Sequence, residues 1–203
     1  MCVILIAETH PLTERTIRDA VRSNPDGIGM AWRESNRVSF AKGLTIENAI
    51  ELAENVPLPY VFHARIATIG AVSDELCHPF PLDKRLSIDA TAGVSSRGVL
   101  FHNGHWCVAA EDTEGNDLFD SPHWSDTKLM AWRLREHEFK HVSEFVPPHQ
   151  KVVVLTPKTL ERYGNSWVRM QRGVWASNDR GLSESTLLFK NAPMFNQKAR
   201  VSA

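Results

Sequence analysis

Strand-like and helix-like segments follow one another in this sequence without regular alternation, and this order constrains the fold more than any other feature. The apolar run Val3–Ala7 predicts a buried strand, and Thr13 is expected to cap the helix that follows. Residues 27–32 and 37–43 then predict a hairpin of two strands around the polar turn 33–36. Because repeated strand–helix–strand units are missing, the order predicts an α+β protein built from packed layers.

Later segments continue this irregular order. Thr45 is expected to cap a helix over 46–56, and Ser125 or Asp126 a helix within 123–140. The apolar side of that last helix is expected to be formed by Leu129, Ala131 and Trp132. Further strands are predicted within 60–70, 98–110, 151–157, 167–170 and 174–177.

The size and composition of the chain favour a single folded domain over residues 1–203. A hydrophobic share of 42% and a charged share of 23% are typical of globular proteins. The net charge of −1 offers a phosphate backbone no overall attraction, so nucleic-acid binding is not expected. Three widely spaced cysteines argue against a disulfide framework and favour a cytoplasmic location. No apolar run reaches about 18 residues, so no membrane span is predicted.

Cys2 directly follows the initiator methionine and leads into the first predicted strand. Cysteine is small enough for the methionine before it to be removed, which would leave a thiol and a free α-amine on one residue. An amine with a pKa of roughly 7.7–8.0 could take the proton of a thiol with a pKa of about 8.5, so that the sulfur attacks an amide. The alternative is that Cys2 is a small apolar residue at the start of a strand.

Asn103 and Gly104 provide two hydrogen-bond donors at adjacent positions, a side-chain amide and a backbone N–H. An acyl-transfer site needs such a pair to hold the negative oxygen of its tetrahedral intermediate. A side chain at position 104 would obstruct close approach to that oxygen. The alternative is an ordinary Asn-Gly turn.

Three further residues could bind the two charged ends of an amino acid. Arg65 could clamp an α-carboxylate through two parallel hydrogen bonds, with the Thr68 hydroxyl nearby. Asp126 could accept hydrogen bonds from an α-ammonium group. The alternatives are a surface ion pair for Arg65 and a helix N-cap for Asp126.

Six short segments carrying these residues occur in one order: Cys2, "PDGIGMAW" from position 25, "HARIAT" at 63–68, "CHPF" at 77–80, "FHNG" at 101–104 and "SDT" at 125–127. As an ordered set they resemble the class II glutamine amidotransferase domain of the N-terminal-nucleophile hydrolases. The resemblance spans roughly the first 130 residues. It implies a four-layer αββα sandwich as the fold.

The resemblance also implies an activity, which is hydrolysis of the glutamine side-chain amide to glutamate and ammonia through a thioester on Cys2. Asn103 and Gly104 would form the oxyanion hole, and no cofactor is expected. Arg65 and Thr68 would bind the α-carboxylate of L-glutamine. Gly104 and Asp126 would hold its α-ammonium group, and the loop 69–78 would close over the substrate. Because no synthase region is recognised in the chain, a separate synthase subunit is expected to accept the ammonia.

Two other functions remain open for the same residues. The first is an N-terminal-nucleophile amidase that acts on a γ-glutamyl compound or another amide. The second is a catalytically inactive glutamine-binding regulatory module. Retention of Met1 would favour the second, because the nitrogen of Cys2 would then be an amide and could not act as a base.

A zinc site is the competing interpretation of the histidines and cysteines. The candidate ligands are His102, His105 and Cys107, which are close together in the sequence, and His63, Cys77 and His78 elsewhere. The paired short spacings of zinc sites are missing, and alternation along a strand would put positions 102 and 105 on opposite faces. No metal ion is therefore expected, and His63, His78 and His102 are predicted to be buried and hydrogen-bonded parts of the scaffold.

Overall fold

The computed structural model describes residues 2–106, 121–136, 142–144, 146–171, 173–183 and 187. Within them the chain forms three α-helices, α1 (Glu14–Ser23), α2 (Ile46–Asn55) and α3 (Asp126–Arg135), and two 3₁₀ turns, η1 (Asp74–Leu76) and η3 (Val142–Glu144). The strands are β1 (Val3–Ala7), β2 (Ile28–Glu34), β3 (Arg37–Lys42), β4 (Tyr60–Ala64), β5 (Phe80–Pro81), β6 (Ala92–Ser95), β7 (Val99–Asn103), β8 (Lys151–Leu155), β9 (Leu160–Tyr163), β10 (Val168–Gln171) and β11 (Val174–Ala176).

The strands form two antiparallel sheets. The seven-stranded sheet has the order β10-β11-β1-β4-β2-β3-β6, and the four-stranded sheet has the order β5-β7-β8-β9. Strand β1 lies between β11 and β4, with Val3 opposite Ala64. All five residues of β1 are buried, so the prediction of a buried N-terminal strand is confirmed.

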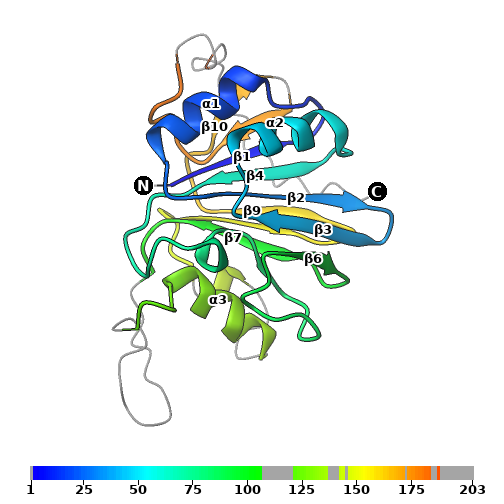
Figure 1. The fold of residues 1–203 in the computed structure, drawn as a ribbon, viewed down its shortest axis with the longest axis vertical. Coiled ribbons are helices and arrows are strands. Elements are labelled where there is room, and N and C mark those ends of the chain that lie inside the picture. Colours follow the sequence, from blue (N-terminus) through cyan, green and yellow to red (C-terminus); the bar gives the residue numbers. More distant parts are fainter. Residues whose placement is uncertain are drawn as a thin grey trace.

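Both faces of the seven-stranded sheet are covered, which explains the unbroken apolar run in β1. Val3 and Leu5 pack in one cluster with residues of α1 and α2, whereas Ile4 and Ile6 pack in another with residues of the four-stranded sheet. A third cluster joins that sheet to α3. Figure 1 shows the same order, with α1 and α2 on one side of the two sheets and α3 on the other. The chain is therefore a mixed α/β protein with antiparallel sheets.

The helices begin where their capping residues predict. The side chains of Thr13 and Thr45 accept hydrogen bonds from the third residue after them, at the starts of α1 and α2. In α3 the cap is Ser125, and Asp126 is the first helical residue. The predicted apolar side of α3 is wrong in one position, because Trp132 is 39% exposed while Leu129 and Ala131 are buried.

The predicted hairpin is formed by β2 and β3, and its turn is tighter than the sequence suggested. Glu34 pairs with Arg37, so the turn consists of Ser35 and Asn36 instead of the four residues 33–36. Ser35 has a φ of +50°, as two-residue hairpin turns require at this position.

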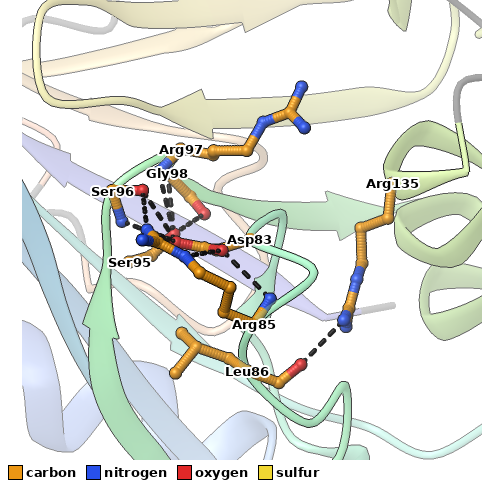
Figure 2. Close-up of polar contacts among 8 residues, drawn as sticks. All are labelled: Asp83, Arg85, Leu86, Ser95, Ser96, Arg97, Gly98 and Arg135. Carbon is orange, nitrogen blue, oxygen red and sulfur yellow. Dashed lines mark hydrogen bonds and ion pairs between the residues drawn. The ribbon is translucent and has the colours of Figure 1, made fainter.

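Residues 82–98 leave the four-stranded sheet after β5, form β6 of the seven-stranded sheet and return to β7. They contain a polar cluster around Asp83 (Figure 2). The buried Asp83 carboxylate accepts hydrogen bonds from the backbone N–H, Nε and Nη2 of Arg85, and from the backbone N–H and hydroxyl of Ser96. Ser95 closes the turn before β7, since its hydroxyl donates to Gly98 O at 2.7 Å. These contacts fasten the 83–85 loop to the turn between β6 and β7.

Candidate active site

A small pocket, which we call the cavity and which is partly open to solvent, is lined by five of the six residues predicted to form the site. Its lining includes Cys2, Arg65, Thr68, Gly104 and Asp126. These residues come from four places: the start of β1, the segment after β4, the end of β7 and the start of α3. Because β1 and β4 are antiparallel neighbours, the start of one strand lies beside the end of the other, which brings Cys2 next to Arg65.

Cys2 is half-buried, with its sulfur beside the segment that follows β4. The Sγ atom lies 3.3 Å from both the backbone nitrogen and the carbonyl oxygen of Ile66, and the N–H can donate to it. The carbonyl oxygen of Cys2 accepts a hydrogen bond from Asn178 Nδ2 at 2.8 Å. Burial raises the pKa of the Cys2 thiol, while the hydrogen bond from Ile66 and the charge of Arg65 lower it.

Arg65 is only 4% exposed, so the alternative of a surface ion pair is wrong. Its Nη1 donates to Ala71 O at 2.8 Å and its Nη2 to Ile69 O at 3.2 Å. No carboxylate of the described residues forms an ion pair with it. A buried guanidinium that meets only neutral carbonyl groups retains affinity for an anion, because hydrogen bonds to charged acceptors are the stronger ones.

Thr68 lies three residues further along the chain, at the exposed rim of the same cavity. Within the described part of the chain its hydroxyl forms no hydrogen bond. It is therefore available to a ligand, as the prediction for this residue requires.

Asp126 supplies the negative charge of the cavity. Its Oδ2 accepts from Trp106 N at 2.9 Å and its Oδ1 from Thr127 N at 2.8 Å. The neighbouring Ser125 performs the capping, so the alternative of an N-cap role for Asp126 is wrong. Asp126 is held by backbone dipoles at the start of α3, where the helix favours negative charge. Since the described residues place no Lys or Arg against its carboxylate, it can accept a hydrogen bond from a cationic ligand.

Asn103 is the one predicted residue that does not line the cavity. It is buried at the end of β7, and its Nδ2 donates to Ser177 Oγ at 2.7 Å. Its Oδ1 is buried without a hydrogen-bond partner in the described structure. An amide nitrogen carries two N–H groups, so one remains for another acceptor. Strand β7 ends at Asn103, so Gly104 lies just outside the strand.

The three scaffold histidines are buried and hydrogen-bonded, as predicted. His78 Nδ1 lies 2.8 Å from His63 Nε2, and His102 contacts Thr127 and Gln150. Burial lowers the pKa of His63 to about 3 and that of His78 well below its ordinary value. Both rings are therefore neutral near pH 7, and neither carries charge into the cavity.

The described residues contain no group of three or more His, Cys, Asp or Glu that could hold a metal ion. His102 has both ring nitrogens engaged by protein groups, and His105 is exposed. Cys107, which the zinc interpretation also used, lies outside the described residues.

Two glycines of the "PDGIG" segment shape the site for a reason that the sequence did not reveal. A Cβ atom at Gly27 would lie 2.2 Å from Cys77 Sγ, and one at Gly29 would lie 1.7 Å from His78 O. The start of β2 therefore needs glycine so that the 77–78 segment can pack against it. Asp26, between Pro25 and Gly27, accepts a hydrogen bond from Ala67 N and thereby holds the segment that carries Arg65 and Thr68.

Ser177, Asn178 and Gln150 also belong to the surroundings of the site, and no motif pointed to them. Ser177 accepts from both Ile4 N and Asn103 Nδ2, and Asn178 donates to Cys2 O, so the residues after β11 hold Cys2 and Asn103 together. No motif lies near them: the pairing of β11 with β1 brings Ser177 and Asn178 close, and the pairing of β8 with β7 brings Gln150 close.

No model of a known protein family matches the sequence, and no curated protein matches it either. The resemblance to the class II glutamine amidotransferase domain therefore depends on the six ordered segments. Among the described residues, no helix combines the length and the apolar character that crossing a membrane requires.

Proposed function

We propose that this protein hydrolyses the side-chain amide of L-glutamine to glutamate and ammonia, with Cys2 as the nucleophile. The observation that carries the proposal is the cavity in which Cys2, Arg65 and Asp126 meet. It contains a nucleophile, a buried cation and a buried anion, and each of the two charged side chains is held by neutral backbone groups. This arrangement is complementary to an α-amino acid zwitterion with a reactive side chain.

The binding step follows from the two charges. The α-carboxylate of glutamine would accept hydrogen bonds from Arg65 and Thr68, and its α-ammonium group would donate to Asp126. Both charged ends of the substrate then replace water as the partners of these groups. The side-chain amide is left to reach toward Cys2 and Gly104, which line the same cavity.

The chemistry would require removal of Met1, which gives Cys2 a free amine. The amine takes the thiol proton as Sγ attacks the amide carbon, and the carbonyl oxygen becomes negative. The N–H of Gly104 and the second N–H of Asn103 would stabilise that oxygen. The amine then returns the proton to the leaving nitrogen, ammonia departs and a thioester remains on Cys2.

Hydrolysis of the thioester repeats the same steps with water as the nucleophile. The amine removes a proton from the water molecule, the oxyanion forms in the same hole, and the proton returns to sulfur as glutamate leaves. Burial raises the pKa of the Cys2 thiol, so the sulfur is protonated before substrate binds and needs this base.

The fold supports the same proposal. Two antiparallel sheets with helices on both outer sides have the layer order of the αββα sandwich, and we assign the chain to that architecture as part of the proposal (Figure 1). A separate synthase subunit that accepts the ammonia, and a cytoplasmic location, stay predictions from the sequence.

The test is intact-mass spectrometry of the mature protein before and after reaction with an electrophilic glutamine analogue. We expect a chain that lacks Met1 and gains one label at Cys2, and glutamate production from glutamine. Cys2→Ala should neither react nor hydrolyse glutamine, while keeping the same circular dichroism spectrum. A panel of γ-glutamyl amides measures the competing amidase function. A chain that retains Met1 and stays unlabelled would contradict the proposal and favour a binding module.

A further inference from the structure

Gln150, immediately before β8, connects two groups that lie behind the cavity wall. Its side chain is almost fully buried. Nε2 donates to His105 O at 2.5 Å, and Oε1 lies 2.8 Å from His102 Nε2. Since Oε1 can only accept, the hydrogen on the His102 ring must be on Nε2. One amide side chain therefore fixes both a backbone carbonyl and the tautomer of a histidine.

The hydrogen bonds continue from His102 to the anion of the cavity. With Nε2 carrying the hydrogen, His102 Nδ1 accepts from the hydroxyl of Thr127, at 3.0 Å. Burial lowers the pKa of His102 and keeps the ring neutral, although the nearby Asp126 opposes this. Thr127 N donates to Asp126, which in turn accepts from Trp106 N.

These contacts form a closed ring, because Trp106 follows His105 in the chain and the His105 carbonyl is bound by Gln150. Its members are Gln150, His102, Thr127, Asp126, Trp106 and His105. Gly104 lies directly against the ring, because a Cβ atom at this position would be 2.8 Å from His102 Nε2 and 3.0 Å from Gln150 Cγ. The backbone from 104 to 106 is thus held by Gln150 at residue 105 and by Asp126 at residue 106.

We propose that Gln150 is a positioning residue, which holds the 104–106 backbone so that the Gly104 N–H stabilises the oxyanion of the bound amide. This inference rests on the proposed glutaminase function. Gln150 lies outside the six recognised segments and is not among the residues that line the cavity, so it acts through Gly104 and not on the substrate. A donor that is displaced by a fraction of an ångström loses much of its effect in the transition state.

Two variants separate the bonds that Gln150 forms. Gln150→Glu keeps the shape and an acceptor for His102 but loses the donor to His105 O, whereas Gln150→Met keeps the length and loses both bonds. Removing an oxyanion donor lowers kcat by about 10²–10³-fold, so we expect each variant to lower kcat by at least about 10-fold. The KM for glutamine should change by less than about threefold, because Arg65 and Thr68 still bind the carboxylate.

The experiment measures kcat per reactive site. The electrophilic glutamine analogue counts the sites that retain a competent Cys2, and the rate of glutamate formation is divided by that count. Ser95→Ala is the matched control, because it removes a buried hydroxyl that fastens a turn away from the cavity. We expect it to keep the kcat of the wild type per labelled site.

The outcomes separate this inference from the function on which it rests. A wild type that binds no label overturns the glutaminase proposal itself. A labelled wild type whose Gln150→Glu variant keeps its kcat per site overturns only the positioning role. Nitrogen-15 NMR of the histidine rings in the wild type requires no variant to fold. A hydrogen on Nε2 of neutral His102 supports the ring of hydrogen bonds, and a hydrogen on Nδ1 overturns it.

Discussion

Two polar clusters of this protein each contain a buried aspartate and an arginine, but the two charges pair in only one of them. In the cluster around Asp83, the buried carboxylate is paired with the Arg85 guanidinium at 2.7 Å and accepts two further bonds from Ser96 (Figure 2). In the cavity, Arg65 and Asp126 are also buried, yet among the described residues only neutral groups lie at hydrogen-bond distance from them. These are two backbone carbonyls for Arg65, and two backbone N–H groups and the Thr127 hydroxyl for Asp126. The first cluster is complete without a ligand, and the second is not.

The difference lies in whether each buried charge has an opposite charge beside it, and this distinguishes a structural cluster from a binding site. Burying a charge without an opposite charge has a free-energy cost, which a folding role alone does not require. The pairing of Asp83 with Arg85 holds the pKa of the carboxyl far below its ordinary value. Unpaired charges of both signs in one cavity instead favour a ligand that brings a carboxylate and an ammonium group.

The sharpest test of the comparison exchanges the two arginines for lysine. Lysine keeps the charge but loses the planar pair of donors. Arg65→Lys should lower kcat/KM for glutamine by about 100-fold, about 2.7 kcal/mol of transition-state stabilisation. The matched variant Arg85→Lys should keep kcat/KM within about twofold. Steady-state kinetics of both variants measures this, and an equal loss in the two would break the distinction.

The second test compares the two carboxylates by stability. Asp83→Asn replaces an ionised acceptor of five hydrogen bonds, so it should lower the free energy of unfolding by about 2 kcal/mol. Asp126→Asn should lower it less, because its partners are two backbone N–H groups and one hydroxyl with no arginine among them, and should instead raise the KM for glutamine. Urea unfolding and steady-state kinetics measure the two effects. A larger stability loss for Asp126→Asn would mean that its role is structural.

The third and smallest effect is the change in the stability contribution of Asp83 at acidic pH. The folded-state pKa of Asp83 lies below its unfolded value of about 3.9, so its stabilisation is present above that pH and is lost as the pH falls toward the folded-state pKa. The stability difference between wild type and Asp83→Asn should therefore shrink by about 1 kcal/mol between pH 5 and pH 3. Urea midpoints at several pH values follow this change. A difference that stays constant with pH would show that the pairing contributes nothing.

Local sequence patterns predicted the local structure well. Thr13, Thr45 and Ser125 cap the helices because their side chains bond to backbone groups within the next turn, which needs no distant partner. The hairpin of β2 and β3 is local in the same sense. Trp132 was assigned to the wrong side of α3, because helical spacing alone cannot show which part of a helix surface meets the sheet.

Local sequence patterns predicted only some of the residues of the candidate site. Cys2, Arg65 and Asp126 could be selected because each carries chemistry in a recognisable segment. Gln150, Ser177 and Asn178 could not, since their importance comes from partners more than 40 residues away in the chain. Nothing near them in the sequence marks them as different from other polar residues at strand ends.

The sequence by itself determined that helices and strands mix without regular alternation, where the helices begin, and which residues carry the chemistry of the candidate site. Only the tertiary structure decided that Arg65 is buried with no carboxylate partner in the described part of the chain, that Asn103 is bonded to Ser177, and that Gly104 lies against Gln150. The physical reason is the separation in sequence between the interacting residues. Caps, turns and apolar periodicity are set by residues within a few positions, whereas charge balance and hydrogen-bond partners in a cavity depend on which strands become neighbours.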